Sequence, residues 1–273
     1  MNHLLRELAP VTDAAWAEIE DEARRALTNF LTARRLVDFT GPEGWDHSAL
    51  GLGRVTDAHE GPAEGVESRV RLVQPLTELR TPFAVSRDEI DAVERGAPDA
   101  DWDPVIHAAR RAALAEDRMV FGGFPGAGVR GLVETSPHAP ITINGDYDHY
   151  PNHVAKAVET LKRAGVTGPY AIALGPRCYT GVIETTQHGG YPVLEHLRLI
   201  LEGPVVWAPA VEGAVVVSQR GGDFELVVGQ DLSIGYLDHD RESVSLYLEE
   251  SVTFRAAGPE AAIALTYEDA PVA

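Results

Sequence analysis

The stretch from Val216 to Tyr236 reads VVSQRGGDFELVVGQDLSIGY, and it carries the most information about the fold. Two apolar runs, 214–218 and 223–228, flank the pair Gly221-Gly222. Two glycines between short apolar runs are typical of a tight turn between antiparallel strands. The sequence therefore predicts a β-hairpin here. Further strands are expected at 232–237, 243–255 and 261–267.

Upstream of this β-rich part, several segments have the periodicity of amphipathic helices. In the first forty residues, Thr12 is a suitable N-cap, acidic residues precede arginines, and Trp16, Ile19 and Leu27 follow helical spacing. This order suits a helix and its dipole. Further helices are expected at 103–120, 151–164 and 192–201, with a buried strand at 170–174. The pattern predicts an α+β chain.

The segment 46–75 differs from its surroundings, because glycines interrupt it at short intervals. Its flanks, 50–56 and 66–76, have the composition of strands. The pattern is typical of a long hairpin arm and not of a packed domain. Since such an arm exposes strand edges, it needs a partner to lie on.

The charge and the cysteine count exclude several classes of protein. The 273 residues include 23 Lys and Arg against 42 Asp and Glu, a net charge of −19. This balance argues against nucleic acid and against anionic membranes as partners. The single cysteine, Cys178, allows no intramolecular disulfide and no cysteine-based zinc site. Because we also find neither a signal peptide nor a long apolar run, we expect a cytoplasmic protein without a membrane segment.

The motifs that suggest catalysis or metal binding are weak. Residues 126–131 match G-x-G-x-x-G, but no buried strand precedes them, so we interpret them as a glycine loop. Asp146, Asp148, His149 and His153 form either a metal cluster or, with Pro151 between the two histidines, a capping loop. Since no specific catalytic set is present, we expect neither an enzyme nor a bound metal.

Several stretches resemble the shell proteins of encapsulin nanocompartments, a family earlier described as linocin- or bacteriocin-like. The stretch 216–236 carries most of the resemblance. Further similar stretches follow in order at 8–12, 41–45, 75–80, 90–96, 168–170 and 190–195. The resemblance implies an α+β capsid fold of the Hong Kong 97 phage type, with a peripheral domain, an axial domain and an extended loop.

The resemblance divides the chain into five parts. Residues 1–45 form the N-terminal helix and arm of the peripheral domain, and 46–75 form the extended loop. Residues 76–134 return to the peripheral domain with its long helix, and 135–222 form the axial domain. Residues 223–273 are expected to supply the C-terminal strands of the peripheral domain.

The family also implies a function. Its members assemble into closed icosahedral shells, here expected to contain sixty subunits, which enclose cargo enzymes through short C-terminal peptides. Cargoes are dye-decolourising peroxidases or ferritin-like iron proteins, which links the family to oxidative stress and iron storage. One alternative is a stand-alone bacteriocin- or peptidase-like enzyme. The other is a viral capsid protein, which would package DNA and which the acidic net charge disfavours.

The resemblance finally implies two sites. The cargo peptide would lie in a groove formed by Phe30, Arg34, Val37, Asp38, Asp231, Leu232 and Ile234. A pore would be lined by Glu184, His188, Gly189 and Gly190. Some members bind a flavin through an aromatic side chain, but the matching segment 86–89 has none, so we expect no cofactor.

Overall fold

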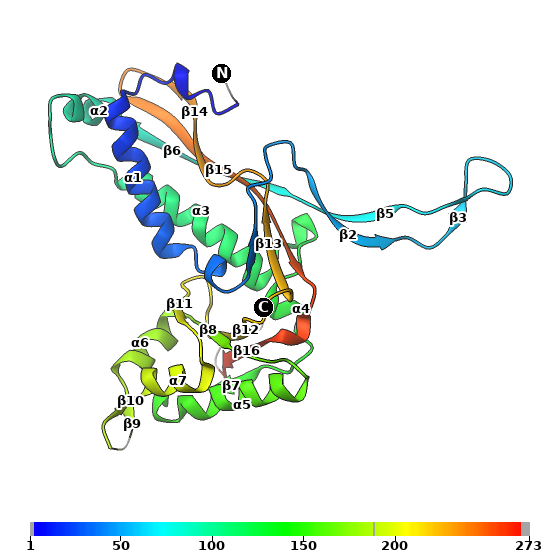
Figure 1. Cartoon of the computed structure of the whole chain (residues 1–273). Coiled ribbons are helices and arrows are strands. Elements are labelled where there is room, and N and C mark those ends of the chain that lie inside the picture. Colours follow the sequence, from blue (N-terminus) through cyan, green and yellow to red (C-terminus); the bar gives the residue numbers. More distant parts are fainter. Residues whose placement is uncertain (1–2, 188, 269–273) are drawn as a thin grey trace.

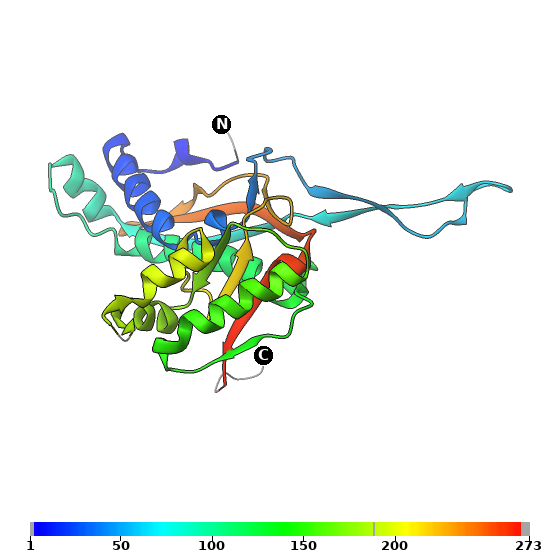
Figure 2. The ribbon, with the colours of Figure 1, turned by 60° about the horizontal axis from the view of Figure 1, so that its bottom comes forward.

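The chain folds around two β-sheets, and a thin two-stranded arm projects away from them (Figure 1). The computed structural model describes residues 3–187 and 189–268. The helices pack on the two sheets, and the arm stands apart from both, as Figure 2 also shows. The predicted α+β composition is confirmed.

The first sheet is built around one long strand, β15, which covers the strand predicted at 243–255. One edge of β15 pairs with β6, and the other edge pairs first with β14 and then with β13. The strands of this sheet are β1 (Asp38–Thr40), β6 (Thr77–Ser86), β13 (Phe224–Val228), β14 (Ser233–His239) and β15 (Ser243–Ala256). Strand β6 has no counterpart among the predicted strands, because Pro82 interrupts the strand pattern.

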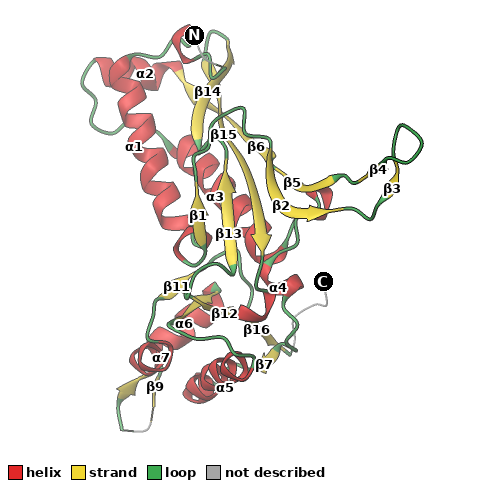
Figure 3. Ribbon diagram, turned by 45° about the vertical axis from the view of Figure 1, so that its right-hand side comes forward, coloured by secondary structure: helices red, strands yellow, loops and turns green. Residues whose placement is uncertain are grey.

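Three helices, α1, α2 and α3, pack beside the first sheet (Figure 3). They are α1 (Asp13–Phe30), α2 (Arg87–Glu94) and α3 (Asp103–Gly122). Trp16 and Ile19 of α1, Val105 of α3 and Leu246 and Leu248 of β15 share one apolar core. Their periodicities, 3.6 residues in the helices and two in the strand, bring these residues to the shared interface.

The second sheet has the strand order β11-β8-β12-β16-β7. Its strands are β7 (Ile141–Ile143), β8 (Tyr170–Leu174), β11 (Val205–Trp207), β12 (Ala214–Ser218) and β16 (Ala262–Tyr267). The helices that pack on it are α5 (Tyr150–Arg163), α6 (Pro176–Glu184) and α7 (Val193–Leu201). Every residue of β8 and β12 is buried, which explains their unbroken apolar sequence.

The predicted β-hairpin around Gly221-Gly222 is wrong. Strand β12 pairs with β8 and β16 in the second sheet, whereas β13 pairs with β15 and β1 in the first. The two glycines, both at φ 81°, make the turn that carries the chain from one sheet to the other. The N–H of Gly222 donates to the carboxylate of Asp38 at 2.6 Å. A local turn signal does not reveal which strand each flank pairs with.

The end of the chain also differs from the expected division. Strand β16 lies within 223–273, which the resemblance assigned to the C-terminal strands of the peripheral domain. It pairs instead with β12 and β7 in the second sheet. The physical reason is its fully apolar core-facing stretch, which the second sheet buries between those two strands. Along the chain, β15 is therefore the last strand of the first sheet.

The predicted hairpin arm is present. Strands β2 (Ala49–Val55) and β5 (Arg71–Pro75) pair antiparallel near its base, and β3 (His59–Glu60) pairs with β4 (Glu67–Ser68) farther out. Five large apolar side chains of the arm are between 41% and 65% exposed: Val55, Val66, Val70, Leu72 and Val73. The described part of the chain leaves these side chains open to solvent.

The glycine loop 126–131 connects two helices. It follows α3 and leads into the short helix α4 (Leu132–Thr135), with one turn of 3-10 helix at Pro125–Ala127. The strand that a dinucleotide-binding loop requires does not precede it. The interpretation as a glycine loop is therefore confirmed.

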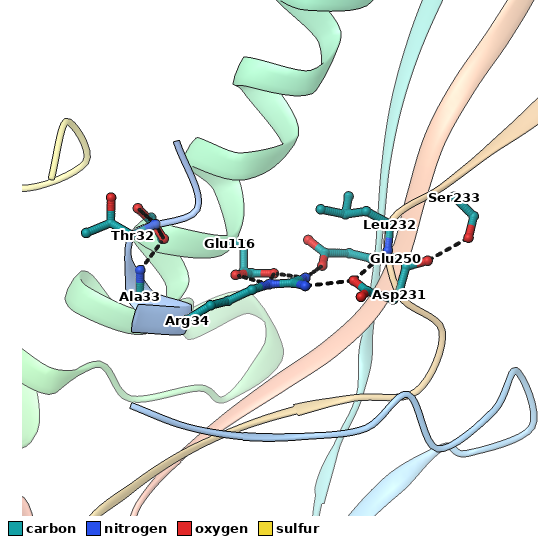
Figure 4. Close-up of polar contacts among 9 residues, drawn as sticks. Thr32, Ala33, Arg34, Glu116, Asp231, Leu232, Ser233 and Glu250 are labelled. Carbon is teal, nitrogen blue, oxygen red and sulfur yellow. Dashed lines mark hydrogen bonds and ion pairs between the residues drawn. The ribbon is translucent and has the colours of Figure 1, made fainter. Parts of the chain in front are cut away.

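The first helix ends at Phe30, earlier than its sequence pattern suggests. The carboxylate of Asp117 on α3 accepts hydrogen bonds from the backbone N–H groups of Thr32 and Ala33, at 3.1 and 2.9 Å. These bonds turn the chain into the 3-10 helix Ala33–Arg35 (Figure 4). Burial raises the pKa of Asp117 to about 7, although the two backbone hydrogen bonds act in the opposite direction.

The raised pKa of Asp117 makes the free energy of unfolding depend on pH. Because the pKa in the folded chain lies above the ordinary value of 3.8, the folded chain binds this proton more tightly than the unfolded chain. The resulting stabilisation is complete below about pH 4 and is lost as the pH rises to 7, at about 1.4 kcal/mol per pH unit. Asp117→Asn keeps the oxygen acceptor but cannot ionise.

We expect the free energy of unfolding of Asp117→Asn to fall less between pH 5 and pH 8 than that of the unchanged protein, measured by urea unfolding at several pH values. The exposed Asp91→Asn is the control and should follow the unchanged protein. Equal slopes for Asp117→Asn and the unchanged protein would contradict this assignment.

Candidate functional site

The main candidate site is a groove of about 500 Å³ between α1 and the segment that leads into β14. Three parts of the chain form it: the N-terminal segment, α1 with the turn after it, and the first sheet. The lining residues are Leu4, Arg6, Glu20, Ala23, Arg24, Leu27, Thr28, Leu31, Arg34, Asp231, Leu232, Ser233, Ile234 and Leu248.

The floor of the groove is apolar. Leu27 comes from α1, Leu232 and Ile234 come from the sheet segment, and Leu248 comes from β15. Ile234 and Leu248 are buried in the core of the first sheet, while Leu232 is half-buried. The floor can therefore accept small aliphatic side chains of a ligand without exposing the core beneath it.

Asp231 shapes the strand entry beside this floor. Its side-chain Oδ1 accepts the N–H of Leu232 at 2.8 Å, and its backbone carbonyl accepts the hydroxyl of Ser233 at 2.7 Å. Both bonds are local, and they set the direction in which Leu232 enters β14. The short polar sequence Asp231-Leu232-Ser233 thus positions one wall of the groove.

One end of the groove is charged, and Arg34 is at its centre (Figure 4). Its Nη2 lies 2.5 Å from Oε2 of Glu116 and 3.3 Å from Oε2 of Glu250, and its Nη1 lies 2.8 Å from Oδ1 of Asp231. Glu116 and Glu250 are fully buried, whereas the side chain of Asp231 is 41% exposed. One guanidinium therefore joins α3, β15 and the groove wall.

This arrangement shifts the protonation of two of its members. Burial opposes the charge of Arg34, but hydrogen bonding and attraction from Glu116, together with Asp231 and Glu250, outweigh it and raise the pKa of the guanidinium. Burial, together with the neighbouring Glu116, raises the pKa of Glu250 well above its ordinary value. Arg34 thus stays charged, while Glu250 binds a proton more readily than an ordinary glutamate.

The groove unites four of the seven residues that the resemblance implied: Arg34, Asp231, Leu232 and Ile234 all line it. Phe30 packs elsewhere, with its ring 5.5 Å from that of Trp207. Val37 and Asp38 line a separate cavity of about 210 Å³ beside the turn between the sheets. For Val37 and Asp38 the cause is the early end of α1, since the turn at 33–35 moves the residues after it off the helical face.

Sequence reasoning missed the N-terminal part of the groove. Leu4 is buried and lines it together with Arg6. Nη2 of Arg6 lies 2.5 Å from Oε1 of Glu20, and its guanidinium lies 4.2 Å from the centre of the Trp16 ring. The segment has no periodicity of its own, so no sequence pattern marks it as a wall of a site.

The expected pore residues lie at one tip of the molecule (Figure 1). Helix α6 ends at Glu184, and the hairpin of β9 (Thr186–Gln187) and β10 (Tyr191–Pro192) follows. Gly189 and Gly190 are exposed and have φ of 101° and 79°, which favours glycine at both positions. His188 lies outside the described residues.

The cysteine and the acidic and histidine residues that the sequence offered as possible reactive or metal-binding groups make structural contacts. Cys178 is buried, its Sγ lies 3.0 Å from the hydroxyl of Tyr267, and burial raises the pKa of its thiol. Nδ1 of His149 lies 3.0 Å from Oδ2 of Asp146, whose side chain also caps the 3-10 turn Tyr147–His149. Within residues 3–187 and 189–268, no group of three or more His, Cys, Asp or Glu side chains is placed to hold a metal ion.

None of the helices within residues 3–187 and 189–268 is both long and apolar enough to cross a membrane.

Comparison with known proteins gives a consistent result. Over residues 1–253 the chain matches the Linocin_M18 family, described as an encapsulating protein for peroxidase. It is 53% identical over 270 residues to the type 1 encapsulin shell protein of Rhodospirillum rubrum, covering 97% of this chain and 96% of that protein. The identity to the type 1 encapsulin shell protein of Mycobacterium tuberculosis is 45% over 267 residues, covering 98% and 100%.

Solved structures support the same fold. A virus-like particle from Pyrococcus furiosus superposes with a TM-score of 0.67 at 15% identity, covering 92% of this chain and 99% of that chain. The capsid of Myoviridae phage XM1 superposes with a TM-score of 0.54 at 12% identity, covering 83% and 88%. These likenesses confirm the predicted capsid fold of the Hong Kong 97 type.

The family match and the relatives above 40% identity cover almost the whole chain. The sequence resemblance is therefore confirmed, and the stand-alone enzyme of the alternative interpretation is not supported. The chain belongs to the encapsulin shell protein family and is a structural shell subunit.

Proposed function

We propose that sixty copies of this chain close into an icosahedral shell in the cytoplasm and that each copy holds a short peptide of a cargo enzyme in the groove between α1 and β14. The observation that carries this proposal is the groove itself, with an apolar floor and one charged end. The family description names a peroxidase, which makes a dye-decolourising peroxidase the first candidate cargo and a ferritin-like iron protein the second.

The chemistry of the groove favours an extended peptide with small aliphatic side chains. Leu27, Leu232 and Ile234 supply the apolar contacts, and each well-buried aliphatic side chain contributes about 1.5–3 kcal/mol. At the charged end, Arg34 is already committed to three carboxylates, so Asp231 is the group with acceptor capacity for a peptide N–H or a basic side chain. Ordering a disordered peptide costs entropy, and a cargo with several tails offsets this by avidity.

The arm supports assembly into a shell. Its exposed side chains at Val55, Val70 and Leu72 are apolar area that a single subunit leaves in water. Pairing with neighbouring copies would bury this surface and cover its strand edges. This burial has to outweigh the repulsion between subunits that each carry a net charge of −19.

The hairpin loop at 184–190 is our candidate for the pore. Glu184, Gly189 and Gly190 are exposed at a tip of the molecule, and glycines without side chains permit several copies to approach closely. His188 remains part of this proposal. Five such loops around a symmetry axis would border an opening for small substrates of the cargo.

The groove proposal is tested by placing a charge in its floor. Leu232→Asp puts an unpaired carboxylate among apolar contacts, and we expect cargo per shell to fall at least about tenfold while shells assemble normally. The measurement is co-purification of tagged cargo with shells of normal size. Leu237→Asp, the same exchange at an exposed position of β14, is the control and should load cargo fully. Full loading by Leu232→Asp would show that the peptide binds elsewhere.

The arm proposal is tested by shortening the hairpin at a paired position. Leu50 and Gln74 face each other, so the dipeptide asparagine–glycine in place of residues 51–73 closes the ladder with a tight turn and removes all five exposed apolar side chains. We expect folded subunits that remain small species in light scattering, because the contact surface with neighbours is lost. Glu64→Gln near the tip should still give shells. Intact shells from the shortened chain would refute the role of the arm.

A further inference from the structure

The N-terminal segment occupies the edge of the groove where a bound peptide would lie. Strand β14 is at the end of the first sheet, and within the described residues its ladder partner is β15 alone. The backbone N–H of Tyr236 points away from β15 and donates to the carbonyl of Leu4 at 2.8 Å. The segment thus makes a strand-like contact with the outer edge of β14.

The same edge continues into the groove. The backbone N–H and C=O of one residue in an antiparallel strand point to the same side, and residues two apart share that side. Since Tyr236 pairs in register with Leu246 and points outward, Ile234, paired with Leu248, also directs its N–H and C=O outward. Ile234 lines the groove, so the edge offers backbone hydrogen bonds to an extended chain there.

A small number of side-chain contacts hold the segment in place. The ring of His3 stacks on Trp45 with 3.8 Å between centroids and 9° between planes. Its Nε2 lies 3.5 Å from Oε1 of the buried Glu249. On the other side of Leu4, Arg6 pairs with Glu20 of α1. The segment is therefore attached at its two ends, with Leu4 between them against the groove.

Leu5 gives this attachment a strained backbone. It has φ 52° and ψ 24°, in the left-handed region that residues with a Cβ rarely adopt. Such strained positions occur preferentially in segments that switch between two arrangements. The contacts of His3, Leu4 and Arg6 must outweigh this strain, so the attached state is one that a competing ligand can displace.

We propose that residues 4–6 are a displaceable wall of the groove: Leu4 occupies the Tyr236 position of the β14 edge, and the wall must move away before a longer extended peptide can pair along that edge. This inference rests on the proposed function, because it concerns the same groove. The ligand class is an extended peptide that adds to the edge of β14 as a further strand.

Two substitutions at one position test the wall. Leu5→Pro holds φ near −65°, which excludes the observed backbone and should release the segment, whereas Leu5→Gly adopts the left-handed region freely and should retain it. The readout is hydrogen–deuterium exchange of the Tyr236 amide in assembled shells. We expect exchange at least tenfold faster in Leu5→Pro, and exchange in Leu5→Gly within about twofold of the unchanged protein.

A labelled synthetic peptide with the sequence of residues 3–8 provides a second readout. It should bind Leu5→Pro shells at least tenfold more tightly than unchanged shells, since the edge is then open. If Leu5→Pro does not assemble, the double variant His3→Ala and Arg6→Ala releases the same segment without touching Leu5. Protection of the Tyr236 amide equal to that of the unchanged protein, in whichever released variant assembles, would overturn the proposal.

These outcomes are separable from those for the proposed function. Loss of cargo in Leu232→Asp together with unchanged Tyr236 exchange in the released variants would overturn the wall and leave the cargo groove standing. Full cargo in Leu232→Asp together with fast Tyr236 exchange and peptide binding in Leu5→Pro would support the wall and refute the cargo groove.

Discussion

Two fully buried acidic side chains, Glu116 on α3 and Glu250 on β15, share one cation, the guanidinium of Arg34. Removing one partner would leave a buried charge uncompensated, which costs far more than an exposed ion pair contributes. This contact joins the turn after α1 to the long helix and to the central strand of the first sheet. It also holds Asp231, so the wall of the groove depends on the same guanidinium.

The turn that presents Arg34 is itself determined by a neighbouring buried acid. Asp117 follows Glu116 directly on α3 and accepts the backbone N–H groups of Thr32 and Ala33. Consecutive residues of one helix thus end α1 and hold Arg34 in the turn that follows it. The groove runs along the second half of α1 to the turn that follows it, and these two acids determine the position of its charged end.

The sequence predicted elements whose signals are local. The periodicities of α1, α3, α5 and the long strand β15, and the arm with its glycines, all have counterparts in the structure. Pairing between distant strands has no local signal, and for that reason the Gly221-Gly222 turn was mistaken for a hairpin and β16 was assigned to the wrong sheet. For the groove, Arg34 and Leu232 could be named through a family resemblance, whereas Leu4 joins it by a backbone hydrogen bond that any residue could make.

A shell subunit has to expose surfaces that a monomeric protein would cover, and this chain separates them. The arm presents apolar side chains far from the two sheets, while the groove is formed within the first sheet and its helices. Electron cryo-microscopy of shells purified with their cargo tests the central claim most directly. The account predicts peptide density in the groove beside Leu232 and Ile234, absent from cargo-free shells; an empty groove in shells that contain cargo, with density at another inner surface, would contradict it.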